Sequence, residues 1–219
     1  MAAAQKDRIP STIRTKKMSN NKIKSIGVFI DGGYYAKIDD KLSETSGMRL
    51  DVTKLTHFIR SVVAEQCGAE KSCCQVVENH YFRGRFRASE ANAKKILFSE
   101  RKFEDALIEN DVIFHYKHLR EIDGNIIEKG IDVWYALEAY ELATIRQFDY
   151  VVLITGDADH EMLIKKLKAL HTNVILLTGD FGDASATSRL LRDEATLHID
   201  LGEKFQQQPE LIEKLCRKG

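Results

Sequence analysis

The 219-residue sequence lacks any apolar run long enough to span a membrane, and its N-terminus lacks the apolar core of a signal peptide. Both of its two prolines lie near the ends, so no proline interrupts secondary structure in between. Its composition, 43% apolar and 30% charged, is typical of globular proteins. We therefore expect a cytoplasmic protein without a membrane partner.

A net charge is also lacking, since Lys and Arg total 33 and Asp and Glu total 33. This balance excludes a strong overall electrostatic attraction to nucleic acid and leaves only local patches. Residues 1–22 carry most of their charge as Lys and Arg and have almost no apolar periodicity. We expect a disordered basic arm there, one compact domain over 23–203, and a C-terminal helix over 204–219 that packs on the domain or trails it.

Cysteines are few, and none has the spacing of a zinc finger or of a redox pair. The sequence contains Cys67, the adjacent Cys73 and Cys74, and Cys216, with no CxxC and no Cys/His pair at metal-binding spacing. We expect free, partly buried thiols in a reducing compartment.

Three common sites for phosphate and acyl chemistry are missing. There is no GxGxxG for a dinucleotide, no GxxxxGK[ST] for a P-loop, and no recognisable elbow for a Ser or Cys nucleophile. Asp31-Gly32-Gly33 has glycines, but its carboxylate would repel a bare pyrophosphate.

What the chain does contain is an alternation of apolar strand-like runs with helical patterns. Because such alternation is typical of parallel sheets covered by helices, we predict a single α/β domain with a mainly parallel central sheet. The predicted strands are 24–30, 75–82, 111–116, 150–154, 173–178 and 197–201, with a hairpin over 121–127. The predicted helices are 51–63, 89–109, 129–142, 159–171, 184–192 and 210–217.

Carboxylates follow the ends of several of these elements. Asp31 and Asp157 each follow an apolar strand beside a glycine, Asp159 comes two residues later, and Asp132 lies at a predicted helix start. Because ligands of open parallel sheets bind beyond the carboxyl ends of the strands, these acids can meet in one crevice. Each can also be a simple helix N-cap, and the residues alone leave both interpretations open.

If these carboxylates meet, a cation is needed to neutralise their mutual repulsion. Their hard oxygen ligands suit Mg²⁺ or Mn²⁺ rather than zinc. Such a site is typical of phosphodiester hydrolysis, in which the ion activates the attacking water. His160 follows Asp159, but a single histidine in a first helical turn is more often exposed than functional. We also expect structural roles for His80, His115 and His118.

Arginines alternate with aromatic residues between Tyr81 and Arg87. This combination suits single-stranded nucleic acid, since the aromatic rings can stack on bases and Arg83 and Arg85 can contact phosphates. An ordinary surface loop that joins a strand to a helix can have the same composition, and both interpretations stay open.

Taken together and in order, four segments of the chain resemble the NYN domain, the LabA-like branch of the PIN-like nuclease superfamily. They are Val28-Phe-Ile-Asp-Gly-Gly-Tyr-Tyr35, Lys129-Gly-Ile-Asp-Val133, Phe148-Asp-Tyr-Val-Val-Leu-Ile-Thr-Gly-Asp-Ala-Asp159, and Ser188-Arg-Leu-Leu191 leading to His198-Ile-Asp-Leu201. The resemblance implies a three-layer α/β/α sandwich and a metal-dependent ribonuclease.

Carried over by position, the resemblance implies that Asp31, Asp132 and Asp157 are the catalytic and metal-binding acids, with Asp159 as a further metal ligand. Lys129 would lie beside them on the substrate side. Tyr34 would also contact substrate, although it stands where many members of the family have Asn.

The resulting hypothesis is a Mg²⁺- or Mn²⁺-dependent hydrolase that cleaves RNA, with single-stranded RNA as its partner. The first alternative is an RNA-binding or protein-interaction module with the same fold and little or no catalysis. The second alternative is a metal-dependent phosphatase on a small substrate. Association into a homo-oligomer is left open by the sequence.

Overall fold

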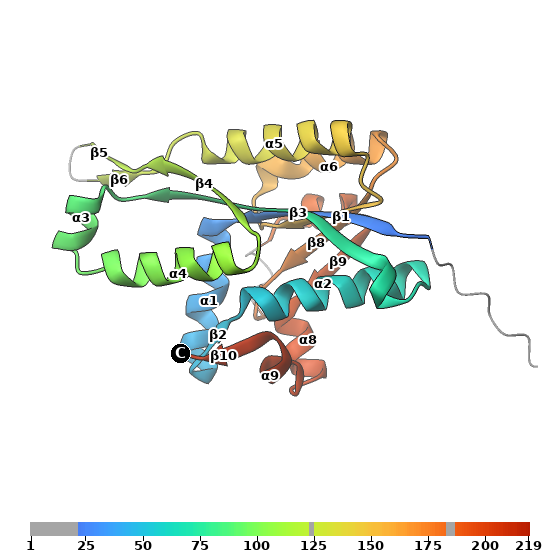
Figure 1. Ribbon diagram of the computed structural model, residues 1–219, viewed down its shortest axis with the longest axis horizontal. Helices are drawn as coiled ribbons and strands as arrows, with labels where there is room; N and C mark the ends of the chain where they lie inside the picture. Colours follow the sequence, from blue (N-terminus) through green and yellow to red (C-terminus); the bar gives the residue numbers. More distant parts are fainter. Residues whose placement is uncertain (1–21, 123–124, 183–186) are drawn as a thin grey trace, which may run out of the picture.

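A computed structural model describes residues 22–122, 125–182 and 187–219. Its centre is a six-stranded sheet of order β4–β3–β1–β7–β8–β9, in which every neighbouring pair is parallel (Figure 1). In chain order the strands are β1 (Lys24–Asp31), β3 (Cys74–Arg85), β4 (Ile113–His118), β7 (Tyr150–Ile154), β8 (Asn173–Thr178) and β9 (Leu197–Asp200). The predicted α/β fold with a mainly parallel sheet is confirmed.

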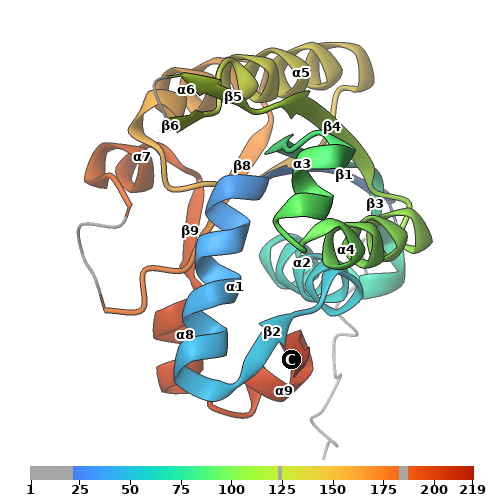
Figure 2. The same ribbon diagram turned by 90° about the vertical axis from the view of Figure 1, so that its left-hand side faces the viewer.

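Helices cover both faces of the sheet, which makes the three-layer sandwich implied by the resemblance. On one face lie α5 (Ile131–Arg146), α6 (Glu161–Ala169) and α7 (Arg189–Glu194) (Figure 2). On the other lie α1 (Gly32–Ser46), α2 (Val52–Cys67), α4 (Leu97–Glu109), α8 (Leu201–Gln207) and α9 (Leu211–Leu215).

The strands supply apolar side chains to both helical layers because successive residues of a strand point to opposite faces. In β1, Val28 and Ile30 pack under α1 and α2, whereas Phe29 packs under α5. In β7, Val152 and Leu153 divide in the same way. This explains why the central strands read as continuous apolar runs rather than as alternating ones.

The sequence did not predict α1, because its two leading glycines indicated only a sharp turn. Asp31 is its N-cap, and its carboxylate accepts the backbone N–H groups of Gly33 and Tyr34. Gly32 is needed for close packing, since a Cβ there would lie 2.6 Å from the carbonyl oxygen of Phe82. The 15-residue helix α1 therefore begins with glycines that resemble a turn in the sequence.

The single helix predicted over 89–109 is wrong, because the structure divides it into α3 (Ala88–Ala93) and α4. Between them Lys95 has a φ of 60°, in the left-handed region that ends helices. The predicted strand over 75–82 is too short, since β3 continues to Arg85. Arg83 and Arg85 therefore belong to a strand and not to a loop.

The C-terminal helix predicted over 210–217 ends earlier than expected. α9 stops at Leu215, and Cys216–Lys218 forms β10, which pairs antiparallel with β2 (Met48–Leu50). Leu215 and Cys216 are fully buried, so this end of the chain packs into the core. Because the pairing with β2 joins residues far apart in sequence, no local pattern could predict it.

Three predictions fall wholly or partly outside the described residues: the basic arm over 1–22 apart from Lys22, the turn at Asp123–Gly124, and the start of the helix over 184–192. The strands around that turn, β5 (Arg120–Ile122) and β6 (Asn125–Ile127), pair antiparallel as predicted. The four cysteines are free thiols, as expected. Of the helices in the described part of the chain, none combines the length and apolar character that crossing a membrane requires.

Candidate metal centre

The candidate site lies where the strand order of the sheet reverses. β1 has β3 on one side and β7 on the other, so the chain winds outward in both directions from this point. Crevices at the carboxyl ends of such strands are the usual ligand sites of open α/β sheets. Asp31 ends β1 and Asp157 follows β7, so both acids reach this edge.

Three side chains converge there: Asp132 from α5, Asp157 from the loop after β7, and His160 from the 3₁₀ turn η2 (Ala158–His160). One ligand atom from each lies within 4.8 Å of the other two. The two aspartates are exposed, whereas His160 is only 2% exposed. The group thus has a buried nitrogen base and a solvent-facing pair of carboxylates.

The structure decides which acids are helix caps. Asp132 is not a cap, because Gly130 occupies the N-cap position of α5 and the Asp132 side chain makes no capping bond. Asp157 caps η2 through Oδ1, which accepts the backbone N–H of Asp159 at 3.0 Å. Asp159 contributes that N–H, but its carboxylate is not part of the three-residue group.

The expectation that His160 is exposed is wrong. Its ring packs against that of Tyr135, with the centroids 4.7 Å apart. Its Nε2 is buried and has no hydrogen-bond partner among the described residues. Burial lowers the pKa of His160, although the charges of Asp157, Asp31 and Asp132 oppose the shift. A neutral imidazole that has one unpartnered nitrogen and lies close to two carboxylates is suited to binding a cation.

The position of His160 relative to Asp157 was a sequence signal for this site. Asp157 and His160 are three residues apart, a spacing that places two side chains on one side of a helical turn. Spacing alone did not distinguish a ligand from an exposed histidine, because that distinction depends on the burial of the ring against Tyr135.

Asp31 lies beside this group without belonging to it. Its Oδ1 accepts the two capping N–H bonds, and its Oδ2 accepts the Thr155 hydroxyl at 3.4 Å. Burial raises the pKa of Asp31, and the negative charge of Asp132 raises it further, against the capping bonds from Tyr34 and Gly33. Of the predicted acid triad, the structure joins two members within 4.8 Å and places the third as a neighbour.

Sequence reasoning missed two residues at this edge. Thr155 is fully buried and joins the two acid loops, since its hydroxyl group reaches Asp31 while accepting the backbone N–H of Asp157 at 3.3 Å. Glu128 precedes α5 and has a raised pKa, chiefly through burial and then through the charges of Asp31 and Asp132. Its position four residues before Asp132 was the only sequence signal.

The four predicted substrate contacts have different surroundings. Arg85 forms an ion pair with the buried Glu104 at 3.0 Å. Tyr34 is buried, and its hydroxyl group hydrogen-bonds to Thr187 at 3.0 Å and to Asp180 at 3.3 Å. Substrate contact by Arg85 or Tyr34 stays a prediction, but each side chain already has partners within the protein.

Arg83 and Lys129 are exposed. Lys129 lines a hollow of about 450 Å³ that ends at Gly130, two residues before Asp132. The walls of this basic hollow are Arg87, Lys117, His118, Leu119, Arg120, Lys129 and Gly130. Four of these seven residues are Lys or Arg, and Gly130 is the N-cap of α5, the helix that carries Asp132.

The fold and the acidic edge define a PIN-like α/β protein. The family model of the NYN domain matches residues 25–202, and the chain belongs to this family. NYN domains are generally nucleases that act on nucleic acid, and PIN-like nucleases usually use divalent metal ions.

A relative in Synechococcus elongatus, the low amplitude and bright protein LabA, is 28% identical over 110 residues. The match covers 48% of this chain and 56% of the relative, so it spans little more than half of that protein. A crystal structure of a protein of unknown function from Vibrio parahaemolyticus has the same fold, with a TM-score of 0.57 and 19% identity. That likeness covers 84% of this chain and 95% of the other.

Proposed function

We propose that this NYN domain hydrolyses RNA phosphodiester bonds with the help of a divalent metal ion at the switch point of the sheet. The observation that supports this most is the convergence of Asp132 and Asp157 on His160, whose buried Nε2 has no partner among the described residues. A buried nitrogen without a partner carries a desolvation cost that a bound cation would remove.

The residues fit such an ion in number and in chemistry. Asp132, Asp157 and His160 would hold it, and when bound it would polarise the phosphate and promote ionisation of the attacking water. Because imidazole nitrogen binds transition metals better than Mg²⁺, this set favours Mn²⁺ over Mg²⁺. Asp159 remains outside the set in this proposal, since its carboxylate does not join the group.

The neighbouring residues would orient these ligands and move a proton. Thr155 holds the Asp31 and Asp157 loops in register through its hydroxyl group. Asp31, with its raised pKa, would accept a proton at Oδ2, because Oδ1 is engaged in capping α1. Tyr34 would have a supporting role, bracing the start of α1 against Asp180.

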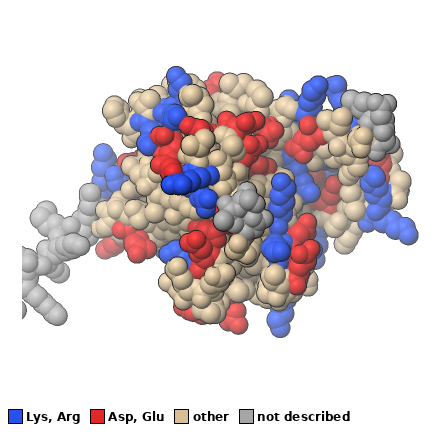
Figure 3. Space-filling model, turned by 180° about the vertical axis from the view of Figure 1, so that it is seen from behind, with Lys and Arg blue, Asp and Glu red and all other residues tan. Residues whose placement is uncertain are grey.

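RNA would reach the acids by way of the basic hollow. Positive side chains at Lys117, Arg120 and Lys129 suit the phosphate backbone, and exposed Arg83 would add a further contact. On the face shown in Figure 3, acidic and basic side chains are interspersed, in agreement with the zero net charge. Binding would therefore depend on this local patch and not on a strong overall field.

The test is cleavage of a mixed-sequence single-stranded RNA by the full chain in Mg²⁺, in Mn²⁺ and in EDTA. We expect cleavage in Mn²⁺, less in Mg²⁺ and none in EDTA. Asp157→Asn should reduce the rate about 100-fold or more, since even residues that only support a metal ligand cost about 10–100-fold. Asp105→Asn, the same change at an exposed position of α4, is the matched control.

Each other outcome separates this proposal from its alternatives. Cleavage that persists in EDTA, or that is equal in Asp157→Asn and Asp105→Asn, contradicts the metal site. Metal-independent RNA binding without turnover indicates an interaction module. Turnover of p-nitrophenyl phosphate but not of RNA indicates a phosphatase.

A further inference from the structure

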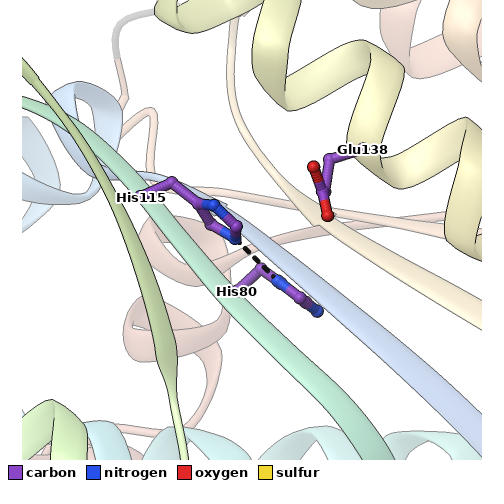
Figure 4. Close-up of side chains that lie close together, drawn as sticks. All are labelled: His80, His115 and Glu138. Carbon is purple, nitrogen blue, oxygen red and sulfur yellow. Dashed lines mark hydrogen bonds between the residues drawn. The ribbon is translucent and has the colours of Figure 1, made fainter.

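A second group of metal-binding side chains lies under the middle of α5, away from the acids. His80 comes from β3, His115 from β4 and Glu138 from α5, and one ligand atom from each lies within 4.8 Å of the others (Figure 4). Glu138 is six residues beyond Asp132, which at 1.5 Å per residue is about 9 Å along the helix axis. The two groups are therefore separate positions on one helix.

Two members of this histidine cluster, His80 and Glu138, also hydrogen-bond to a residue outside it. His80 Nε2 hydrogen-bonds to Glu78 Oε2 at 3.2 Å, which leaves Nδ1 directed at His115. Glu138 Oε2 accepts the indole N–H of Trp134 at 3.0 Å. A histidine whose far nitrogen donates to a carboxylate is the usual arrangement of a metal ligand, because the second bond fixes the tautomer and the ring orientation.

Aromatic stacking fixes the ring planes as well. His115 is parallel to Phe82, with centroids 4.3 Å apart and planes at 7°. His80 is parallel to Phe29 at 5.3 Å and 9°. Rings that are already ordered lose little conformational entropy when they bind an ion.

Burial lowers the pKa of both histidines, so each is neutral at neutral pH and offers a lone pair. His80 Nδ1 and His115 Nε2 are 2.9 Å apart and share a hydrogen bond. Two nitrogens on a tetrahedral zinc ion, each at 2.0–2.1 Å, would be about 3.3 Å apart. To become ligands of one ion, the two nitrogens would move apart by a few tenths of an ångström and the rings would turn so that both lone pairs point at the ion.

We propose that His80 Nδ1, His115 Nε2 and a carboxylate oxygen of Glu138 form a binding site for a divalent transition-metal ion of the zinc type. Two nitrogens and one oxygen leave a fourth position for solvent, as in three-ligand zinc sites. The ion would brace α5 against β3 and β4, and so stabilise the helix that carries Asp132. Without the ion, the two imidazoles hydrogen-bond to each other.

The test uses the full chain, stripped of metal with EDTA and then dialysed, with Co²⁺ as a spectroscopic probe and Zn²⁺ in calorimetry. The doubly substituted Asp157→Asn, His160→Phe protein serves as background, since it removes two of the three acid-site ligands. We expect the visible absorption of four-coordinate Co²⁺, its displacement by Zn²⁺, and a rise in melting temperature with Zn²⁺. In that background His115→Gln or Glu138→Gln should weaken Zn²⁺ binding about tenfold or more.

Glu138→Gln keeps an acceptor for the Trp134 indole, and far-UV circular dichroism checks the fold of each variant. His57→Gln, at an exposed position of α2, is the control for loss of a histidine. The proposal is overturned if the background protein gives no such Co²⁺ spectrum, or if the spectrum survives unchanged in His115→Gln and Glu138→Gln. RNA cleavage plays no part in the readout, so this proposal and the ribonuclease proposal fail separately.

Discussion

Two groups of possible metal ligands lie along α5, and they differ in whether their nitrogen atoms have hydrogen-bond partners without an ion. In the acid site His160 Nε2 has no hydrogen-bond partner among the described residues, and one ring nitrogen of His160 lies within 4.8 Å of two exposed carboxylates. In the histidine cluster, His80 and His115 hydrogen-bond to each other. Without a cation, the acid site therefore leaves a buried nitrogen without a partner among the described residues, whereas the two imidazoles of the histidine cluster are partners of each other.

The difference also appears in the charges. Around the acid site the pKa of Asp31 is raised by burial and by Asp132, so the ion-free protein holds a carboxylate at an energetic cost. The histidine cluster combines two neutral rings with one carboxylate, and Trp134 stabilises that carboxylate. We therefore infer that a metal ion would matter for function at the first site and for stability at the second.

The largest expected effect that distinguishes the two sites is that of His160→Phe. Phenylalanine fills the same space against Tyr135 but has no nitrogen, so Mn²⁺ affinity should fall about 10–100-fold. Binding measured by electron paramagnetic resonance also reports nitrogen coordination, which should vanish in the variant. Mg²⁺ affinity should change less, because Mg²⁺ prefers oxygen ligands.

His57→Phe, which removes an exposed imidazole from α2, is the matched control. If wild type and His160→Phe show the same Mn²⁺ affinity and the same spectrum, His160 is a core histidine and not a ligand. Unchanged binding would then make the acid site a carboxylate pair.

A smaller effect is expected from Asp31→Asn, measured by thermal unfolding in EDTA. Asparagine also caps helices, so α1 is retained while a buried charge is removed. At pH 7.5 the variant should be more stable than wild type, by roughly 2–4 °C for each kcal/mol gained. A raised pKa means that Asp31 stabilises the fold only at low pH and that this contribution is lost as pH rises, so the gain should shrink towards pH 4.

Asp51→Asn provides the control, since Asp51 caps α2 in the same way through the backbone N–H of Lys54. A melting temperature of Asp31→Asn below that of wild type at pH 7.5 would contradict the cost of burying the Asp31 charge beside Asp132. Added Mn²⁺ should stabilise both proteins, because the variant keeps Asp132, Asp157 and His160.

The smallest effect concerns the histidine cluster in EDTA. Because burial lowers the pKa of His80 and His115 below 6.5, the unfolded chain binds protons more tightly than the folded one. Their contribution to stability is present above pH 6.5 and is lost as pH falls. Urea unfolding of wild type between pH 7.5 and 5 should therefore show a steeper loss of stability than that of His115→Gln.

His160 and His198 also have lowered pKa values, so the slope should be reduced and not abolished. His57→Gln should leave the slope of wild type unchanged. Parallel curves for wild type and His115→Gln would mean that the cluster is not the source of the pH dependence.

Much of the fold could be predicted because its signals are local. Apolar runs such as Val151–Ile154 are buried on both faces, and strand–helix alternation dictates parallel pairing. The sequence failed at α1, where glycines resembled a turn, and at Lys95, where a left-handed residue divides a continuous apolar pattern. At α1 the reason is close packing of Gly32 against Phe82, which is distant in sequence.

By itself, the sequence determined which acids end the strands and lead the helices, since Asp31, Asp132 and Asp157 stand at element boundaries that are locally encoded. Only the tertiary structure decided that Asp132 and Asp157 meet at His160, that Asp31 is a capping neighbour, and that His80, His115 and Glu138 come together. The physical reason is that burial and proximity arise from the strand order, which joins residues from separate segments at one edge. An imidazole exposed on one helix and an imidazole buried beneath another have the same local sequence signal, and only their neighbours distinguish them.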